Sequence, residues 1–202
     1  MHKIIVFITG CIIGAVSVML LLNVSTFNGD DESVSESARD SQMLDTYFIE
    51  QMIPHHEDAV KISRLATEYA RREEIKDLAQ SIIADQTQEI TVMDEIYRDM
   101  VGKTVSKNEM NIHHHGDISL DKLHMGTTGT AYDIERFKNE DNFDKLFLEH
   151  MITHHQMAVM MAEVVKTGTD TKEIQNLADT IIVTQNKEIS QMQKWYTDWY
   201  TK

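Results

Sequence analysis

The sequence contains two copies of one unit, and this duplication limits the folds that the chain can adopt. An offset of 99 aligns residues 45–97 with residues 144–196 without a gap, and about 20 of the 53 aligned positions are identical. Repeated units of this kind are supersecondary structures that bury their apolar faces against one another. We therefore expect two copies of one small structure to pack together.

Within each unit, the apolar residues recur at the spacing of an amphipathic helix. The intervals alternate between four and three residues, as in a helix whose seam faces a bundle core. The seam is Phe48, Met52, His55, Ala59, Ile62 and Ala66 in the first unit, and Phe147, Met151, His154, Ala158, Met161 and Val165 in the second. A second stripe follows over residues 75–93 and 174–192. A two-helix hairpin leaves apolar surface uncovered, so the sequence predicts an all-α four-helix bundle from two duplicated hairpins.

The N-terminal segment has the composition of a membrane anchor. Residues 4–22 carry no charge, and as a helix they are long enough to cross a hydrocarbon core of about 30 Å. Lys3 precedes this run, and Asp30 and Asp31 follow it, so the positive-inside tendency places the N-terminus in the cytoplasm. We expect an N-terminal transmembrane helix over residues 1–23 with the C-terminal domain outside the cytoplasm. A cleaved signal segment would instead leave the protein secreted.

The remaining chain divides by composition. Residues 24–41 are rich in Ser, Asp and Glu, which predicts a flexible acidic spacer. The duplicated four-helix domain is expected over residues 42–198, with a His-containing join over residues 101–141 between the two units.

Charge and cysteine content limit the partners. The formal net charge of -14 argues against nucleic acid and favours cations. The single cysteine, Cys11, lies inside the apolar run, so the exported part can form no disulfide and offers no thiolate. Any metal site there must use His, Met, Asp or Glu.

Each unit carries a methionine followed by a histidine pair. Met52, His55 and His56 are spaced so that a thioether lies one helical turn from both imidazoles. The same spacing recurs in the second unit at Met151, His154 and His155, and Met157 and Met161 follow. Imidazole with thioether and without thiolate suits copper, above all Cu(I), although imidazole also binds zinc and other divalent transition metals. We predict a metal site from these eight residues.

Structural roles would also explain these residues. A methionine at a seam position commonly fills core volume. A buried histidine needs hydrogen-bond partners, and Gln86, Glu89, Gln185 and Glu188 are placed to supply them across each hairpin. The two glutamates would then orient imidazoles, or they would be exposed helix charges.

The join holds a second group of candidate metal ligands. These are Met110, His113, His114, His115, His124 and Met125. Short His-rich tracts bind transition metals loosely, because the backbone must be ordered on binding. A hydrophilic loop without metal is the alternative.

The paired stretches FIEQMIPHHEDAV and FLEHMITHHQMAV resemble the signature of the domain of unknown function 305 family. The resemblance covers both units and rests on the duplicated M-x-x-H-H-x-x-A pattern. It implies a ferritin-like four-helix architecture and a role in copper binding or copper resistance outside the cytoplasm. The family's Met-Ala pair after the histidines is matched by Met161 and Ala162, whereas the first unit has Ile62 and Ser63. A fully symmetric site is therefore not expected.

Three functions are compatible with these patterns. The first is a membrane-anchored, extracytoplasmic protein that binds Cu(I) for buffering, resistance or transfer to a partner protein, either alone or as a homo-oligomer. The second is a structural or interaction module with a hydrogen-bonded histidine core. The third is a ferritin-like oxidoreductase, but that class needs a histidine three residues after a glutamate, and Ile53 and Ile152 occupy those positions. We therefore assign no catalytic residues.

Overall fold

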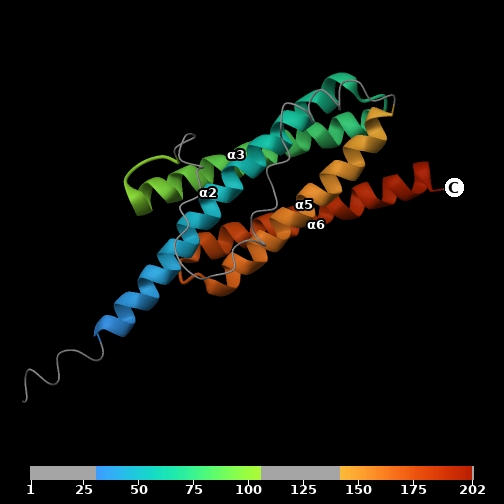
Figure 1. Ribbon diagram of the computed structural model, residues 1–202. Coiled ribbons are helices and arrows are strands. Elements are labelled where there is room, and N and C mark those ends of the chain that lie inside the picture. Colours follow the sequence, from blue (N-terminus) through green and yellow to red (C-terminus); the bar gives the residue numbers. More distant parts are fainter. Residues whose placement is uncertain (1–30, 106–141, 202) are drawn as a thin grey trace, which may run out of the picture. The chain divides into compact units, whose positions relative to one another are not determined.

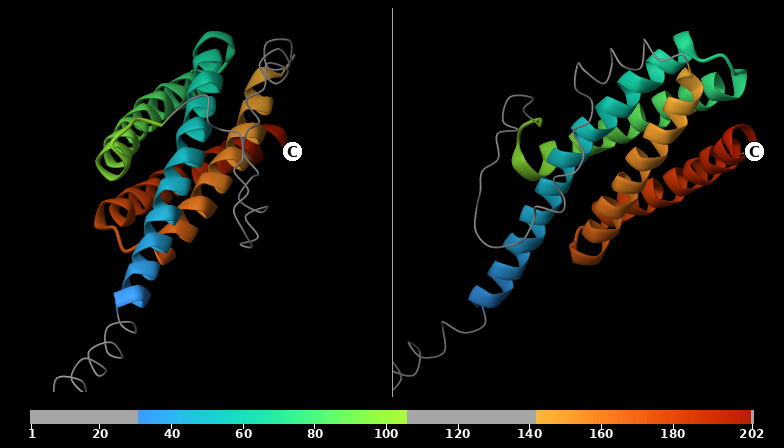
Figure 2. Two further views of the ribbon diagram at one scale, coloured as in Figure 1. Left: turned by 60° about the vertical axis from the view of Figure 1, so that its left-hand side comes forward. Right: turned by 45° about the vertical axis from the view of Figure 1, so that its right-hand side comes forward.

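The computed structural model describes residues 31–105 and 142–201, and these residues form four helices and no strand. The helices are α2 (Asp31–Tyr69), α3 (Glu73–Val101), α5 (Phe143–Gly168) and α6 (Lys172–Tyr200). Helix α2 lies beside α3, and α5 lies beside α6, as the two hairpins require (Figures 1 and 2). The prediction of an all-α, four-helix structure is confirmed.

The beginning of α2 differs from the expected domain boundary. Residues 31–41, which we expected to belong to a flexible spacer, are helical. Once a helix is nucleated, each further residue adds one hydrogen bond, so an amphipathic helix can extend into a polar segment that contains Glu, Ala and Arg. The chain divides into two units between Asp40 and Ser41.

The predicted membrane anchor over residues 1–23 lies outside the described residues. Among the helices of residues 31–105 and 142–201, none is both long enough and apolar enough to span a bilayer.

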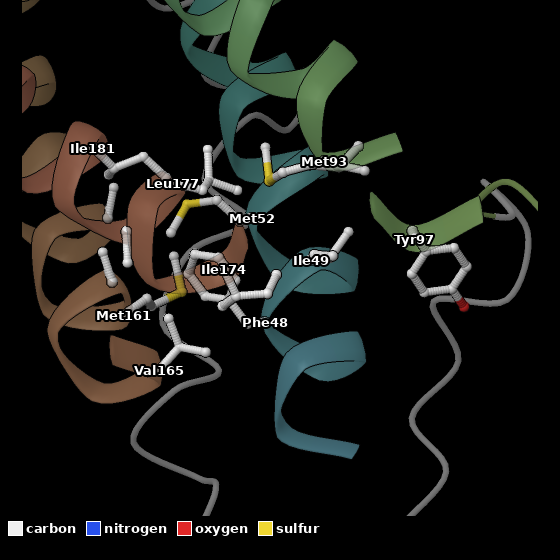
Figure 3. Close-up of a cluster of buried hydrophobic side chains, with 14 residues drawn as sticks. Phe48, Ile49, Met52, Met93, Tyr97, Met161, Val165, Ile174, Leu177 and Ile181 are labelled. Carbon is white, nitrogen blue, oxygen red and sulfur yellow. The ribbon is translucent and has the colours of Figure 1, made fainter. Parts of the chain in front are cut away.

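The core of the unit Ser41–Lys202 consists of two apolar clusters. The first comprises Phe48, Ile49, Met52, Ile53, Met93, Tyr97, Ala158, Met161, Ala162, Val165, Ile174, Leu177, Ala178 and Ile181 (Figure 3). The second comprises Ala59, Ile62, Ala66, Ala70, Ile75, Ala79, Ile82, Phe143, Phe147, Leu148, Met151 and Met192. The first cluster joins the early part of α2 to the later parts of α3 and α5, and the second joins the later part of α2 to their early parts. Helix α2 therefore runs antiparallel to both α3 and α5.

The first helix of each duplicated unit holds the interhelical turn of the other unit. The Asp144 carboxylate accepts hydrogen bonds from the backbone N–H groups of Arg71 (2.9 Å) and Arg72 (3.1 Å), where α3 begins. The equivalent Asp45 accepts a hydrogen bond of 2.5 Å from the Thr171 hydroxyl, where α6 begins. Both carboxylates are buried. These contacts satisfy polar groups at the helix ends and fix the register of one hairpin against the other.

Candidate metal centre

A layer of buried polar side chains separates the two apolar clusters. On every helix its residues lie between the positions that enter the first cluster and those that enter the second. We call this the polar layer, and its members are His55, His56, Gln86, Glu89, His154, His155, Gln185 and Glu188, all of them at most 8% exposed. Polar groups are expensive to bury without partners. A layer of eight across the middle of a bundle is therefore a candidate functional site.

His55 and His154 meet at the centre of this layer. They occupy equivalent positions of the two units, and their ring centroids lie 3.6 Å apart with the planes 35° from parallel. Both ring nitrogens of each residue are buried and have no hydrogen-bond partner among protein atoms. Burial, followed by the charges of neighbouring histidines, lowers the pKa of both imidazoles well below the ordinary value of 6.5. The central pair is therefore neutral and has nitrogen lone pairs available for a cation.

The second histidine of each pair is oriented by a glutamate of the neighbouring helix. Nε2 of His56 lies 2.7 Å from Oε2 of Glu89, and Nε2 of His155 lies 2.9 Å from Oε2 of Glu188. The prediction that these glutamates are partners of the histidines is confirmed, and the alternative of exposed charges is wrong. In each pair the other ring nitrogen, Nδ1, is buried without a hydrogen-bond partner. A carboxylate that accepts from Nε2–H leaves the lone pair on Nδ1, a common arrangement of metal-binding histidines.

Burial moves the pKa values of His56 and Glu89 in opposite directions. Burial and, after it, the charge of His155 lower the pKa of His56 to about 3, although Glu188 opposes them. Burial and the charge of Asp85 raise the pKa of Glu89 to about 7, and His155 opposes them. Both shifts have burial as their main cause, because a low-dielectric interior disfavours the charged form of either group.

Gln86 and Gln185 are not the hydrogen-bond partners that the sequence suggested. Their side-chain amides are 2% and 1% exposed, and neither the oxygen nor the nitrogen has a hydrogen-bond partner among protein atoms. Each buried donor or acceptor left in this way costs about 1–3 kcal/mol. The expectation of a histidine core that the glutamines satisfy is therefore wrong.

The sulfur atoms predicted to assist lie on both sides of the polar layer. Met52 and Met161 belong to the first apolar cluster, where Figure 3 shows their thioethers among apolar side chains. Met151 belongs to the second cluster, and Met157 is half-buried and outside both. The antiparallel packing causes this division, because the residue one turn before each histidine points toward the opposite cluster. The structure does not gather all four thioethers at one point.

Glu50 and Glu149 bind tyrosines of the neighbouring helix. The Tyr97 hydroxyl donates to Oε1 of Glu50 at 2.5 Å, and the Tyr196 hydroxyl donates to Oε1 of Glu149 at 2.7 Å.

Over residues 31–105 and 142–201, no three His, Cys, Asp or Glu side chains could hold a metal ion as they stand. A metal in the polar layer would thus require its rings to turn.

One residue near the centre was missed by the sequence analysis. His150 lies one turn before His154, with 6.0 Å between the ring centroids. The duplication hid it, because its counterpart in the first unit is Gln51. The spacing of four residues between His150 and His154, which places both on one helix face, could have identified it.

The second group of candidates, Met110, His113, His114, His115, His124 and Met125, lies outside the described residues.

Comparison with protein families gives a match over both units. The family described as Domain of unknown function (DUF305) matches residues 45–196. The chain belongs to the DUF305 family. Among curated proteins, no sequence matches the chain.

Several solved structures share this bundle. CopM in its Cu(II)-bound form is 40% identical, with a TM-score of 0.66, and the match covers 77% of this chain and 97% of CopM. CopM in its Cu(I)-bound form is 38% identical, with a TM-score of 0.61 and the same coverage. A DUF305 fragment from Deinococcus radiodurans has a TM-score of 0.61 over 77% of this chain and 96% of the fragment. At 22% identity, the fragment bears on the fold alone.

Proposed function

We propose that this protein is a membrane-anchored, extracytoplasmic copper-binding protein that holds Cu(I) for buffering, resistance or transfer. The central histidine pair is the observation that carries the proposal. Four ring nitrogens of His55 and His154 are buried together without protein partners. CopM, which is 40% identical, has been solved with Cu(II) and with Cu(I) bound.

The donor chemistry of the polar layer supports copper as the bound cation. Neutral imidazoles bind a metal without first losing a proton, and burial keeps His55 and His154 neutral. Nδ1 of His56 and of His155 would add two further nitrogen donors, oriented by Glu89 and Glu188. Imidazole suits both oxidation states of copper, and a thioether favours Cu(I).

The methionines would take unequal parts in such a site. Met52 and Met151 each lie one turn before a central histidine, on opposite sides of the polar layer. Met157 and Met161 follow the second pair only, so we expect any help from them on the side of the second unit. The join residues Met110, His113, His114, His115, His124 and Met125 would form a weaker site that collects copper.

Localisation and assembly are further parts of the proposal. The uncharged run over residues 4–22 supports an anchor, and the net charge of -14 would draw cations to the exported domain. A metal-transfer partner protein, a homo-oligomer and a relation of this bundle to ferritin-like folds stay predictions.

A structural or interaction module is the second candidate function. The observation in its favour is the closed hydrogen bonds of His56 with Glu89 and of His155 with Glu188, together with the lack, within the described helices, of a ready three-ligand group. In that case the layer would specify the register of the bundle and bind no metal.

Anaerobic Cu(I) titration under chelator competition distinguishes the two candidates. The full-length chain is compared in detergent with the variant His55→Leu/His154→Leu, and Zn(II) serves as the control metal. Leucine fills the space and removes the orphaned nitrogens, so the variant should keep the fold, which circular dichroism and thermal unfolding would verify. We expect tight Cu(I) binding by the native chain and a loss of at least about 100-fold in the variant, since two first ligands are removed.

A second variant tests the loop alternative. Replacing His113, His114, His115 and His124 by Ala should leave the tight site intact. If this variant loses tight binding and the leucine variant keeps it, the site belongs to the join. If the native chain binds no copper more tightly than zinc, the proposed function is wrong and the structural role is favoured.

A further inference from the structure

His150 is one chemical difference between the two units next to the polar layer. It lies on α5 one turn before His154, and the matching position of α2 holds Gln51. Both residues are half-buried, so the two positions have similar access to solvent. The exchange of an amide for an imidazole therefore gives α5 a nitrogen donor that α2 lacks.

The geometry places three imidazoles in sequence from the half-buried edge to the centre of the bundle. The ring centroids of His150 and His154 are 6.0 Å apart with planes 33° from parallel, and those of His154 and His55 are 3.6 Å apart. Two histidines four residues apart on one helix face form a metal chelate, the arrangement that His-x-x-x-His zinc sites use. His55 reaches the same chelate from α2.

Electrostatic coupling also joins these three rings. Burial is the main cause of the lowered pKa of His55 and of His154, and the charges of other histidines add to it. His150 is one of those histidines in both cases. A charge at His150 is therefore felt at both central rings.

We propose that His150, His154 and His55 form a three-imidazole copper site. This inference rests on the proposed function, and it makes the site asymmetric, with two ligands from α5 and one from α2. Copper enters beside half-buried His150 and is then held by the buried central pair. One ion lies near the second unit, and the Gln51 side of the layer holds none.

Binding requires a modest movement of the rings. With metal–nitrogen bonds of about 2.0–2.1 Å, two imidazoles on one ion have centroids about 5 Å apart. The His55–His154 pair must therefore open from 3.6 Å, and the His150–His154 pair must close from 6.0 Å. This agrees with the absence, in the described part of the chain, of three such side chains that could already hold a metal.

Exchange of residues between the two units tests the proposal on the full-length chain. The variants are His150→Gln, which gives the second unit the residue of the first, and the double variant His150→Gln/Gln51→His, which moves the imidazole to the matching position on α2. Each is loaded with Cu(II), and the number of coupled nitrogens is counted by electron paramagnetic resonance. Cu(I) affinity is measured by anaerobic competition, and thermal unfolding checks the fold.

We expect His150→Gln to reduce the number of coupled imidazoles by one and to weaken Cu(I) binding at least about tenfold. Loss of a group that only orients a metal ligand already costs about tenfold, and loss of a ligand should cost no less. The double variant should regain both, because the pseudosymmetry of the central pair offers the same chelate on α2. Native copper affinity and nitrogen count in His150→Gln would overturn the inference and leave the proposed function standing. A native chain that binds no copper would overturn both.

Discussion

Mild acid should destabilise the apoprotein because its central histidines cannot take up protons in the folded state. The folded pKa values of His55 and His154 lie well below 6.5, which is the ordinary value expected in the unfolded chain. Below pH 6.5 the unfolded state therefore binds protons that the folded state does not, and stability falls as the pH falls. One pH unit below that value, each group removes about 1.4 kcal/mol from the free energy of unfolding. The pair together removes about 2.8 kcal/mol.

The neighbouring His56–Glu89 pair contributes little to this change. His56, with its pKa lowered to about 3, adds a further loss of about 1.4 kcal/mol at pH 5.5. Glu89, with its pKa raised to about 7, acts in the opposite direction, because the folded state holds its proton between pH 4.5 and pH 7 and the unfolded state does not. The two effects nearly cancel, so the central pair determines the net slope.

Urea unfolding followed by circular dichroism measures this effect. The free energy of unfolding is determined with a metal chelator at pH 7.5 and at pH 5.5, for the native chain and for His55→Leu/His154→Leu. We expect the native chain to lose about 2–3 kcal/mol more than the variant between these two values. An equal loss in the two proteins would show that His55 and His154 accept protons in the folded state, which contradicts the burial argument.

Three further predictions concern single side chains. Asp144→Ala should lower the free energy of unfolding by about 1–2 kcal/mol, measured by urea unfolding, because two part-buried N–H groups lose their acceptor. Tyr97→Phe should cost about 1 kcal/mol and Tyr196→Phe a few tenths in the same assay, because the first hydrogen bond is part-buried and the second is exposed. Met52→Leu and Met151→Leu should each change stability by less than about 1.5 kcal/mol while weakening Cu(I) binding, measured by chelator competition.

The same variants have outcomes that would contradict the reasoning. Native stability of Asp144→Ala would mean that water replaces the carboxylate at the start of α3. Equal costs at Tyr97 and Tyr196 would remove the role of burial. Native Cu(I) affinity in both leucine variants would assign Met52 and Met151 to the apolar core alone.

Much of the fold could be predicted from the sequence because the duplication supplies its own alignment. The spacing of Phe48, Met52 and His55 and of their copies identifies helix faces, and two similar hairpins have few ways to cover each other. The pairing of each second histidine with a glutamate also followed, since Glu89 and Glu188 lie at matching positions of the facing helices. The start of α2 did not follow, because helix extension into residues 31–41 depends on propagation and leaves no apolar periodicity.

The geometry of the site could be predicted only in part. Periodicity assigns a residue to a face, but the register between hairpins decides which rings meet. Here the buried Asp45 and Asp144 contacts set that register, and they bring His55 to His154. The division of Met52 and Met151 between two clusters follows from antiparallel packing across the layer. His150 was missed because the comparison of the two units selects residues that both units share, and its counterpart is Gln51.

In each duplicated unit, an aspartate of the first helix accepts hydrogen bonds from the interhelical turn of the other unit, and this exchange suggests how the chain could have evolved. A primitive gene encoding one hairpin would have yielded a chain whose turn was completed only by a second molecule, with the forerunners of Asp45 and Asp144 exchanged between subunits. The forerunners of His55 and His154 would then have faced each other across the twofold axis of a homodimer. Fusion of two such genes would make the folding of the two halves independent of concentration, and it would allow the halves to differ, as they do at Gln51 and His150.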